Sequence, residues 1–160
     1  MSGEPLSEKV KALNLVDYAA AAAQMLLDKY PNIQFNSGRR DSVAQARAMA
    51  PNIAQNRQWV AQTYMANPQS QALQAWVDAH PAAGVAEIQA GLLSIMNGWT
   101  DAQKGTLSRH FSGQAFDIQP VPGPNGDAIK AFIQTLPGKR KFFDKEGGKV
   151  IWHVDFDKPA

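Results

Sequence analysis

The sequence lacks cysteine, and this absence removes several classes of chemistry. Without a thiol, the chain of 160 residues has no disulfide framework, no thiolate metal site and no cysteine nucleophile. Histidine is also scarce, because the chain has only His80, His110 and His153. Any metal site must therefore combine these imidazoles with carboxylates.

Long apolar runs are missing as well. The first eleven residues lack the basic and apolar regions of a secretory signal, and the alanine-rich run after them is interrupted too early to span a bilayer. We therefore expect a protein that is made in the cytoplasm without a signal peptide and that has no integral membrane segment.

The charge of the chain is nearly balanced, with a formal net charge of +2 and a pI near 8.9. The basic residues are scattered apart from Arg39-Arg40 and Lys139-Arg140-Lys141. Such a pattern does not indicate a nucleic-acid partner. It is typical of an ordinary solvated surface, and it would also suit weak attraction to an anionic polymer.

The hydrophobic pattern predicts helices early in the chain and strands later. Trp59, Tyr64 and Trp76 have the spacing of core residues rather than of a sugar-stacking surface. The order of elements predicts an α+β fold in one domain, with helices packed on one face of a small antiparallel sheet. The expected elements are a helix at 7–30, a strand at 33–36, three or four short helices within 42–99, a strand at 115–121, a loop at 122–127, a helix at 127–136 and a strand at 150–156.

Two histidines and an aspartate have a spacing that suits a metal site. His110 and Asp117 lie on either side of Gly113, so a strand that begins after the glycine would bring the aspartate back beside the histidine. His153, in the apolar strand, is a natural third ligand. A catalytic zinc takes three protein ligands of these types and leaves one position to water. From spacing alone, a satisfied core histidine at position 153 stays an alternative.

A longer motif carries a family resemblance. Residues Ser108 to Asp117 fit S-x-H-x-x-G-x-A-x-D at every specified position, and Trp152-His153 follows downstream. On these residues the chain resembles the zinc D-Ala-D-Ala carboxypeptidase/dipeptidase and phage L-alanyl-D-glutamate endopeptidase group, whose metal core is shared with the hedgehog signalling domain. The resemblance implies that His110, Asp117 and His153 hold Zn²⁺ in a fold of that type. It covers about 34–47 and 106–156, and we expect 48–104 to be a helical insertion within the peptidase domain.

The resemblance also reaches an upstream turn. Ser37-Gly38-Arg39-Arg40 looks like the S-G-Y-R turn of the family, with Arg39 in the tyrosine place and Arg40 in the arginine place. In the family that arginine faces a carbonyl or carboxylate of the substrate, a task that suits a planar fork of donors. The alternative for Arg40 is an exposed turn residue paired with Asp41.

Three further polar residues are assigned from their positions in the sequence. Ser108 is predicted to contact the substrate, or else to cap the local backbone. Gln45 is predicted either to line a substrate cleft together with Arg40 or to lie on a helix surface. His80 precedes Pro81 and is expected at the surface, at the end of a helix.

The sequence departs from the family at the catalytic base. Family members carry Glu or Asp three residues before the last histidine, and Val150 occupies that place here. Glu146 is the predicted replacement, acting on the water and the leaving amine, although it can also be read as a solvated loop carboxylate. Asp144 and Asp155 are alternatives, and Asp155 can instead be a partner that orients His153, since period-two geometry places both on one face.

The predicted function is therefore a zinc-dependent peptidase of peptidoglycan that cleaves stem or cross-link peptides containing D-amino acids. A phage endolysin or a virion-associated lysin fits this prediction, and we expect a monomer. Because no signal is evident, a holin, a phage particle or a secretion apparatus would have to deliver it to the cell wall. The alternative is a non-catalytic, zinc-stabilised binding or structural module, such as a phage tail component. A helical protein without metal, in which the motif is coincidental, is a third reading.

Overall fold

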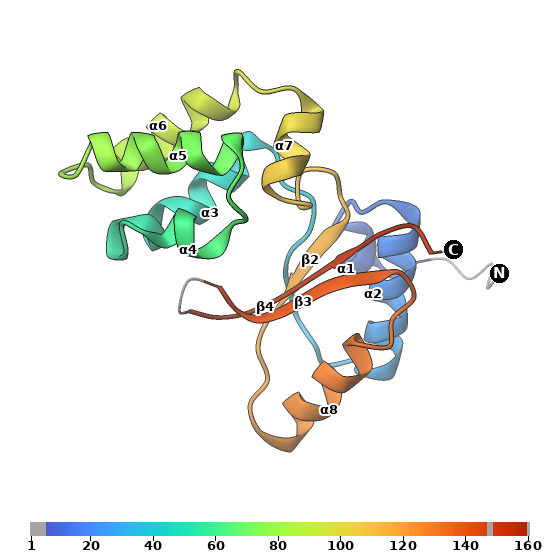
Figure 1. Cartoon of the computed structure of the whole chain (residues 1–160). Coiled ribbons are helices and arrows are strands. Elements are labelled where there is room, and N and C mark those ends of the chain that lie inside the picture. The colour runs from blue at the N-terminus through green and yellow to red at the C-terminus, as the bar shows by residue number, and fades with distance from the viewer. Residues whose placement is uncertain (1–5, 147–148, 160) are drawn as a thin grey trace. The chain divides into compact units, whose positions relative to one another are not determined.

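The computed structural model describes residues 6–146 and 149–159. Within them the chain forms eight helices and one four-stranded antiparallel sheet (Figure 1), which confirms the predicted α+β class. The chain divides into two compact units, one of Met1–Arg39 with Ser112–Ala160 and one of Arg40–Phe111. Across the described residues, no helix is both long and apolar enough to cross a membrane.

The first unit contains the sheet, whose strand order is β1-β2-β4-β3. Three helices of this unit contribute to the same hydrophobic core as the strands. Its elements are α1 (Glu8–Lys11), α2 (Asp17–Lys29), β1 (Phe35–Ser37), β2 (Ala115–Ile118), α8 (Gly123–Ile133), β3 (Lys139–Glu146) and β4 (Lys149–Phe156).

The strands β2 and β4 divide their side chains between an apolar and a polar face. The apolar side chains of the two strands are buried in one core with the alanines and leucines of α2 and the isoleucines of α8. Alternate positions point the other way, because successive side chains of a strand face opposite sides. Asp117 pairs with His153, and Ala115 pairs with Asp155, so both carboxylates share the face of the histidine. The helices thus cover the apolar face and leave the polar one to the candidate site.

The single helix predicted over 7–30 is wrong, because the chain forms α1 and α2 instead. Ser7 caps α1, and its hydroxyl accepts a hydrogen bond from the Val10 amide. Asn14 then adopts φ 53°, in the left-handed region that asparagine tolerates better than most residues. The residues on both sides of Asn14 have a helical pattern, and for this reason the sequence did not reveal the interruption between α1 and α2.

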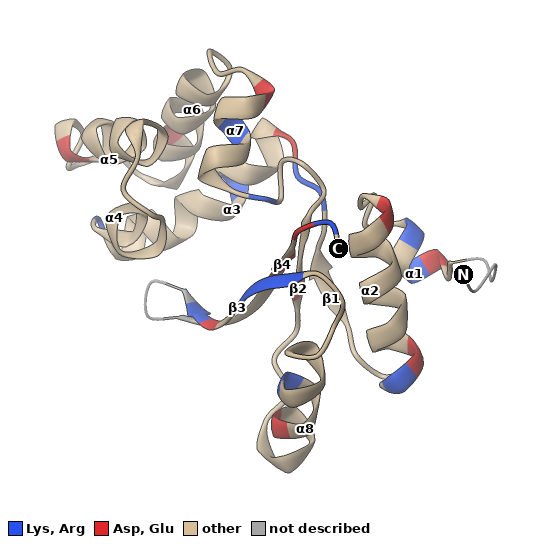
Figure 2. Cartoon of the chain, turned by 45° about the vertical axis from the view of Figure 1, so that its right-hand side comes forward, with Lys and Arg blue, Asp and Glu red and all other residues tan. Residues whose placement is uncertain are grey.

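Two predictions near the C-terminus also need correction. The loop predicted at 122–127 is in fact the first turn of α8, which begins at Gly123 and ends at Ile133. Pro124 is tolerated there because the amides of a first turn need no partner within the helix. The strand β3 was not predicted at all, since its charges, Lys139-Arg140-Lys141 among them, resemble an exposed cluster (Figure 2).

The second unit is helical. It consists of α3 (Ser42–Gln55), α4 (Trp59–Thr63), α5 (Pro68–Ala79), α6 (Val85–Met96) and α7 (Asp101–Leu107). Four of these helices lie within 42–99, as predicted, and α7 is additional. The segment 48–104 lies inside this unit. Trp59 is buried, and Tyr64 and Trp76 pack against the same hydrophobic cluster, which confirms the prediction of these three as core residues.

Two prolines of the helical unit lie at different positions in their helices, one at the start and one in the interior. Pro68 begins α5 within a capping box in which Asn67 and Ser70 exchange hydrogen bonds, so the proline occupies a position that needs no amide donor. Pro51 lies inside α3. The buried side chains of Met49, Ala50 and Ile53 keep that helix in place despite the missing hydrogen bond.

Candidate metal centre

The structure brings the three predicted ligands together. Each of His110, Asp117 and His153 offers one ligand atom, and these atoms all lie within 4.8 Å of one another. All three residues are buried, with 3%, 7% and 7% of their surface exposed. Buried ionisable groups are stable only when they are paired or coordinate an ion, so this cluster can hold a metal.

Strand pairing positions two of the ligands. Asp117 and His153 are directly opposite each other in the β2–β4 ladder, and Asp117 Oδ1 is 3.0 Å from His153 Nδ1. Two atoms bound to one zinc ion at about 2.1 Å in tetrahedral geometry would be about 3.4 Å apart. Only a small movement would therefore open this pair to an ion.

Two hydrogen bonds to its backbone hold the third ligand, His110, in place. Ser108 caps the C-terminus of α7, and its Oγ accepts a hydrogen bond of 3.2 Å from the His110 amide. The carbonyl oxygen of His110 in turn accepts a hydrogen bond of 2.9 Å from the Arg40 amide. Ser108 therefore acts at least as a local cap, which is one of the two roles predicted for it.

Gly113 is the residue of the motif for which the structure gives the clearest steric reason. Its φ is +76°, and a Cβ there would lie 2.6 Å from Arg39 Nη2. Arg39 Nε also donates a hydrogen bond of 2.8 Å to the carbonyl of Asn14. Arg39, in the tyrosine place of the resembling turn, thus packs against the turn that leads from His110 to Asp117.

A carboxylate and an arginine support His153 from its other side. His153 Nε2 is 3.2 Å from Asp155 Oδ2, while Arg140 donates from Nε to Oδ1 at 2.7 Å and from Nη2 to Oδ2 at 3.1 Å. Burial alone would raise the pKa of Asp155, but the hydrogen bonds and charges of His153 and Arg140 outweigh it and lower the pKa below its ordinary value. An ionised Asp155 favours a proton on Nε2, which leaves Nδ1 as the ligand atom.

Asp155 should therefore influence metal affinity without binding the metal. We expect Asp155→Asn to weaken metal binding by about 10- to 100-fold, the usual effect of losing such an outer partner. Competition with a chelating indicator measures this change. Asp127→Asn on α8, whose side chain is exposed, is the matched control and should bind metal as the unchanged protein does. Equal affinities of the two variants would contradict the role of Asp155.

A β-bulge brings a serine to Asp117. The register between β1 and β2 shifts between Phe35 and Ser37, so that Phe35 contacts the apolar core while Ser37 pairs with Asp117. Ser37 Oγ donates a hydrogen bond of 2.9 Å to Asp117 Oδ2, which leaves Oδ1 toward His153. Sequence reasoning missed this role, because no residue pattern reveals a bulge.

An aromatic side chain lies beside the histidine ligand. Phe143 of β3 pairs with His153, and their rings stack with centroids 5.8 Å apart at an interplanar angle of 24°. Phe143 is 40% exposed, and Lys141 Nζ lies 6.0 Å from its ring centroid. Sequence reasoning missed Phe143 together with β3, and only the adjacent aromatic pair Phe142-Phe143 could have signalled the strand.

Of the upstream turn, Arg40 is the residue that belongs to the helical unit, together with Asp41 and Gln45. Asp41 caps α3 by accepting a hydrogen bond from the Ala44 amide at Oδ1. Arg40 is half-buried and donates from Nη1 to Gln45 Oε1 at 3.2 Å. Gln45 is fully buried, which excludes its alternative on a helix surface.

Val150, in the family's place of the base, and the three carboxylates that could replace it have different surroundings. Val150 is 61% exposed and pairs with Lys145, and Asp144 lies 3.7 Å from Lys130 Nζ. Asp155 is held by Arg140 and His153, as its alternative role of orienting partner requires. Glu146 ends β3 opposite Lys149, and its side chain lies outside the described residues. Its assignment as the base stays a prediction.

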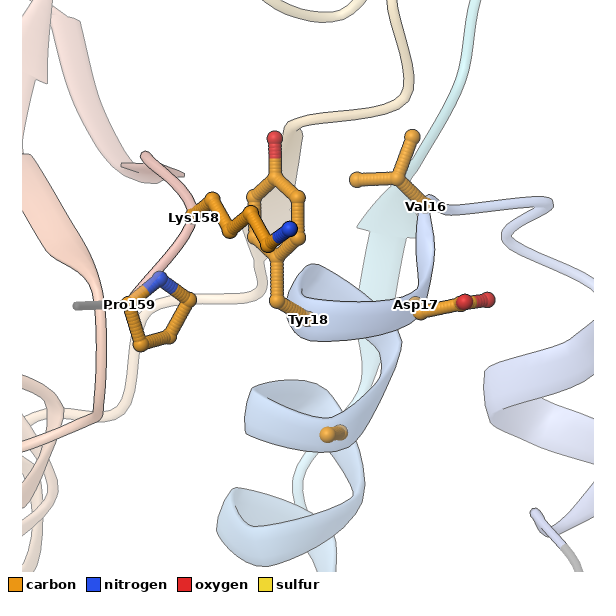
Figure 3. A pocket seen from close by; sticks show the side chains of 6 residues that line it. Val16, Asp17, Tyr18, Lys158 and Pro159 are labelled. Carbon is orange, nitrogen blue, oxygen red and sulfur yellow. The ribbon is translucent and has the colours of Figure 1, made fainter.

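Two features lie away from these ligands. His80 is exposed at the end of α5, where its ring stacks on Trp76, and this confirms its prediction as a surface residue. An open groove on the sheet unit contains none of the predicted site residues (Figure 3). It is lined by Val16, Asp17, Tyr18, Ala21, Lys158 and Pro159.

Two imidazole nitrogens and one carboxylate oxygen suit a divalent transition metal. The candidate metal centre is therefore identified by the ligand atoms of His110, Asp117 and His153 and by the burial of these residues. Comparisons with protein-family models, with curated proteins and with solved structures found no match.

Proposed function

We propose that the chain is a zinc-dependent peptidase of peptidoglycan, acting on stem or cross-link peptides that contain D-amino acids. The observation that carries the proposal is the buried cluster of His110, Asp117 and His153, the residues of the motif on which the family resemblance is based. Three protein ligands of these types are the set found at catalytic zinc, in contrast to the four ligands of most structural sites.

The side chains divide the work of hydrolysis. Bound by His110, Asp117 and His153, a zinc ion would supply Lewis acidity, which polarises the scissile carbonyl and acidifies water. Arg40 holds a carboxylate or carbonyl of the peptide through its planar donors. Glu146 takes the proton of the attacking water and delivers it to the leaving amine as the carbon–nitrogen bond breaks. Asp155 and Arg140 keep the His153 ring in place.

The proposed setting is that of a phage endolysin or a virion-associated lysin. Holin-type release or incorporation into a virion would bring such a peptidase to the cell wall. The mildly basic charge of the chain is suited to an anionic polymer such as peptidoglycan.

Release of amino groups from peptidoglycan tests the function. We expect the purified, zinc-loaded chain to release new amino groups from sacculi of Gram-negative or Gram-positive bacteria, and a chelator to abolish this release until zinc is restored. Mass analysis of digested, defined muropeptides then identifies the bond. No release from either kind of wall by protein that holds its zinc would contradict the proposal and favour the non-catalytic module, for which Val150 in the usual place of the base is the specific observation.

A further inference from the structure

A series of hydrogen-bonded side chains in the helical unit ends on the Arg40 guanidinium. Arg40 Nη1 donates to Gln45 Oε1 at 3.2 Å, and Gln45 Nε2 donates to the hydroxyl of Tyr64 at 3.0 Å. The Tyr64 ring packs edge-on against the buried Trp59, with centroids 5.6 Å apart at 81°. These contacts connect the arginine to the core of α4.

The chemistry of the side chains sets the direction of these hydrogen bonds. Arginine is a donor only, so Gln45 must turn its carbonyl oxygen toward Arg40 and its NH₂ group toward Tyr64. Gln45 is 0% exposed, and a buried amide without partners would be costly. The Tyr64 hydroxyl accepts from this NH₂ group and therefore satisfies the buried glutamine in the orientation that accepts from the arginine.

The backbone of Arg40 is restrained at the same place. Its amide donates to the carbonyl of the predicted ligand His110 at 2.9 Å, and Asp41 caps α3 immediately afterwards. The freedom that is left to Arg40 lies in its side-chain torsions, which the contact with Gln45 restrains. A side chain that is ordered before binding loses less entropy when a ligand arrives.

We propose that Tyr64, acting through Gln45, is a positioning residue that orders the Arg40 guanidinium for a carboxylate of the peptide substrate. The part of this inference that concerns the substrate rests on the proposed function. Tyr64 itself lies in the segment 48–104, outside the region of family resemblance. Gln45 is suited to this task because a neutral amide accepts from the guanidinium without adding a negative charge beside it.

The order of the Arg40 side chain tests the proposal without any need for activity. Tyr64→Phe keeps the ring against Trp59 and removes only the hydroxyl. In the zinc-loaded full chain, ¹⁵N relaxation of the Arg40 Nε–H group should show a clear loss of order in this variant. Unchanged order would overturn the proposal, whether or not the protein proves to be a peptidase.

Kinetics with a muropeptide that ends in a free D-Ala carboxylate test the second part. Tyr64→Phe should raise KM about 3- to 10-fold, the effect of one lost hydrogen bond, with little change in kcat. In an Arg40→Ala background the same change should have no further effect, because Tyr64 acts through Arg40. An equal rise of KM in both backgrounds would overturn the proposal by showing that Tyr64 acts independently. If no muropeptide is cleaved, the proposed function fails, and the relaxation measurement still decides the role of Tyr64.

The chain contains a matched control. In the sheet unit, Gln114 Nε2 donates to the Tyr18 hydroxyl at 2.9 Å, so Tyr18→Phe removes the same kind of hydrogen bond elsewhere. It should change neither the order of Arg40 nor KM. A second variant, Gln45→Glu, keeps an acceptor for Arg40 but adds a charge that repels an anionic peptide, so it should preserve the order of the guanidinium and still raise KM. Loss of order in Tyr18→Phe to the same extent as in Tyr64→Phe would overturn the assignment to Tyr64.

Discussion

Replacing His110 by alanine is expected to remove about one equivalent of bound metal, because only two protein ligands would remain. His110 is buried, and its ligand atom lies within 4.8 Å of those of Asp117 and His153. Metal analysis of protein purified without added zinc measures the loss. In parallel, zinc should raise the melting temperature of the unchanged protein and leave that of the variant almost unaffected, since a ligand stabilises only the state that binds it.

His80 provides the matched control for this measurement. It is the one histidine outside the cluster, and its ring hydrogen-bonds to the Trp76 carbonyl at the exposed end of α5. We expect His80→Ala to retain its metal. If His110→Ala binds as much metal as the unchanged protein, or if the unchanged protein binds none under conditions that load other zinc proteins, the assignment of the centre is wrong.

Replacing Glu146 by glutamine is expected to lower kcat roughly 100- to 10,000-fold, the usual contribution of a general base. The change is nearly isosteric and removes only the ability to accept a proton. KM and metal content should stay close to those of the unchanged protein, because the proposed role of Glu146 is to transfer a proton and not to bind zinc or peptide. Steady-state kinetics on a defined muropeptide, together with metal analysis, separate these quantities.

Asp144→Asn is the control variant for Glu146→Gln. Asp144 is two residues away on β3, and its carboxylate faces Lys130 at 3.7 Å across an exposed surface. Loss of such an ion pair costs at most about 1 kcal/mol. We expect kcat of this variant to be unchanged. A large loss of activity in Asp144→Asn together with full activity in Glu146→Gln would transfer the role of base to Asp144.

The errors in the predicted elements have local physical causes. A helical pattern on both sides of Asn14 predicted one helix, because the pattern does not record the positive φ that separates α1 from α2. The prolines and glycines before Asp127 suggested a loop, although a first helical turn accepts the same residues. In β3 the charged residues concealed a strand whose pairing with β4 provides its stability.

In the candidate site too, the sequence predicted some features and left others to the tertiary structure. The identity and order of the three predicted ligands came from a motif with specified residue types, and the structure brings those residues together. Their supporting contacts depend on other information. Ser37 reaches Asp117 through a bulge, and Arg140 reaches Asp155 from a strand that the pattern did not reveal.

The sequence alone thus determined the α+β class, the helical character of 42–99 and the three residues of the candidate metal centre. Composition, periodicity and short motifs are local properties, and they can be read without knowing which segments meet. Only the tertiary structure decided how the residues of the site are held, through the register of β2 on β4, the bulge in β1 and the hydrogen bond of the buried Gln45 to Tyr64. These features depend on contacts between segments distant in the sequence, where one residue of register reverses the face on which a side chain lies.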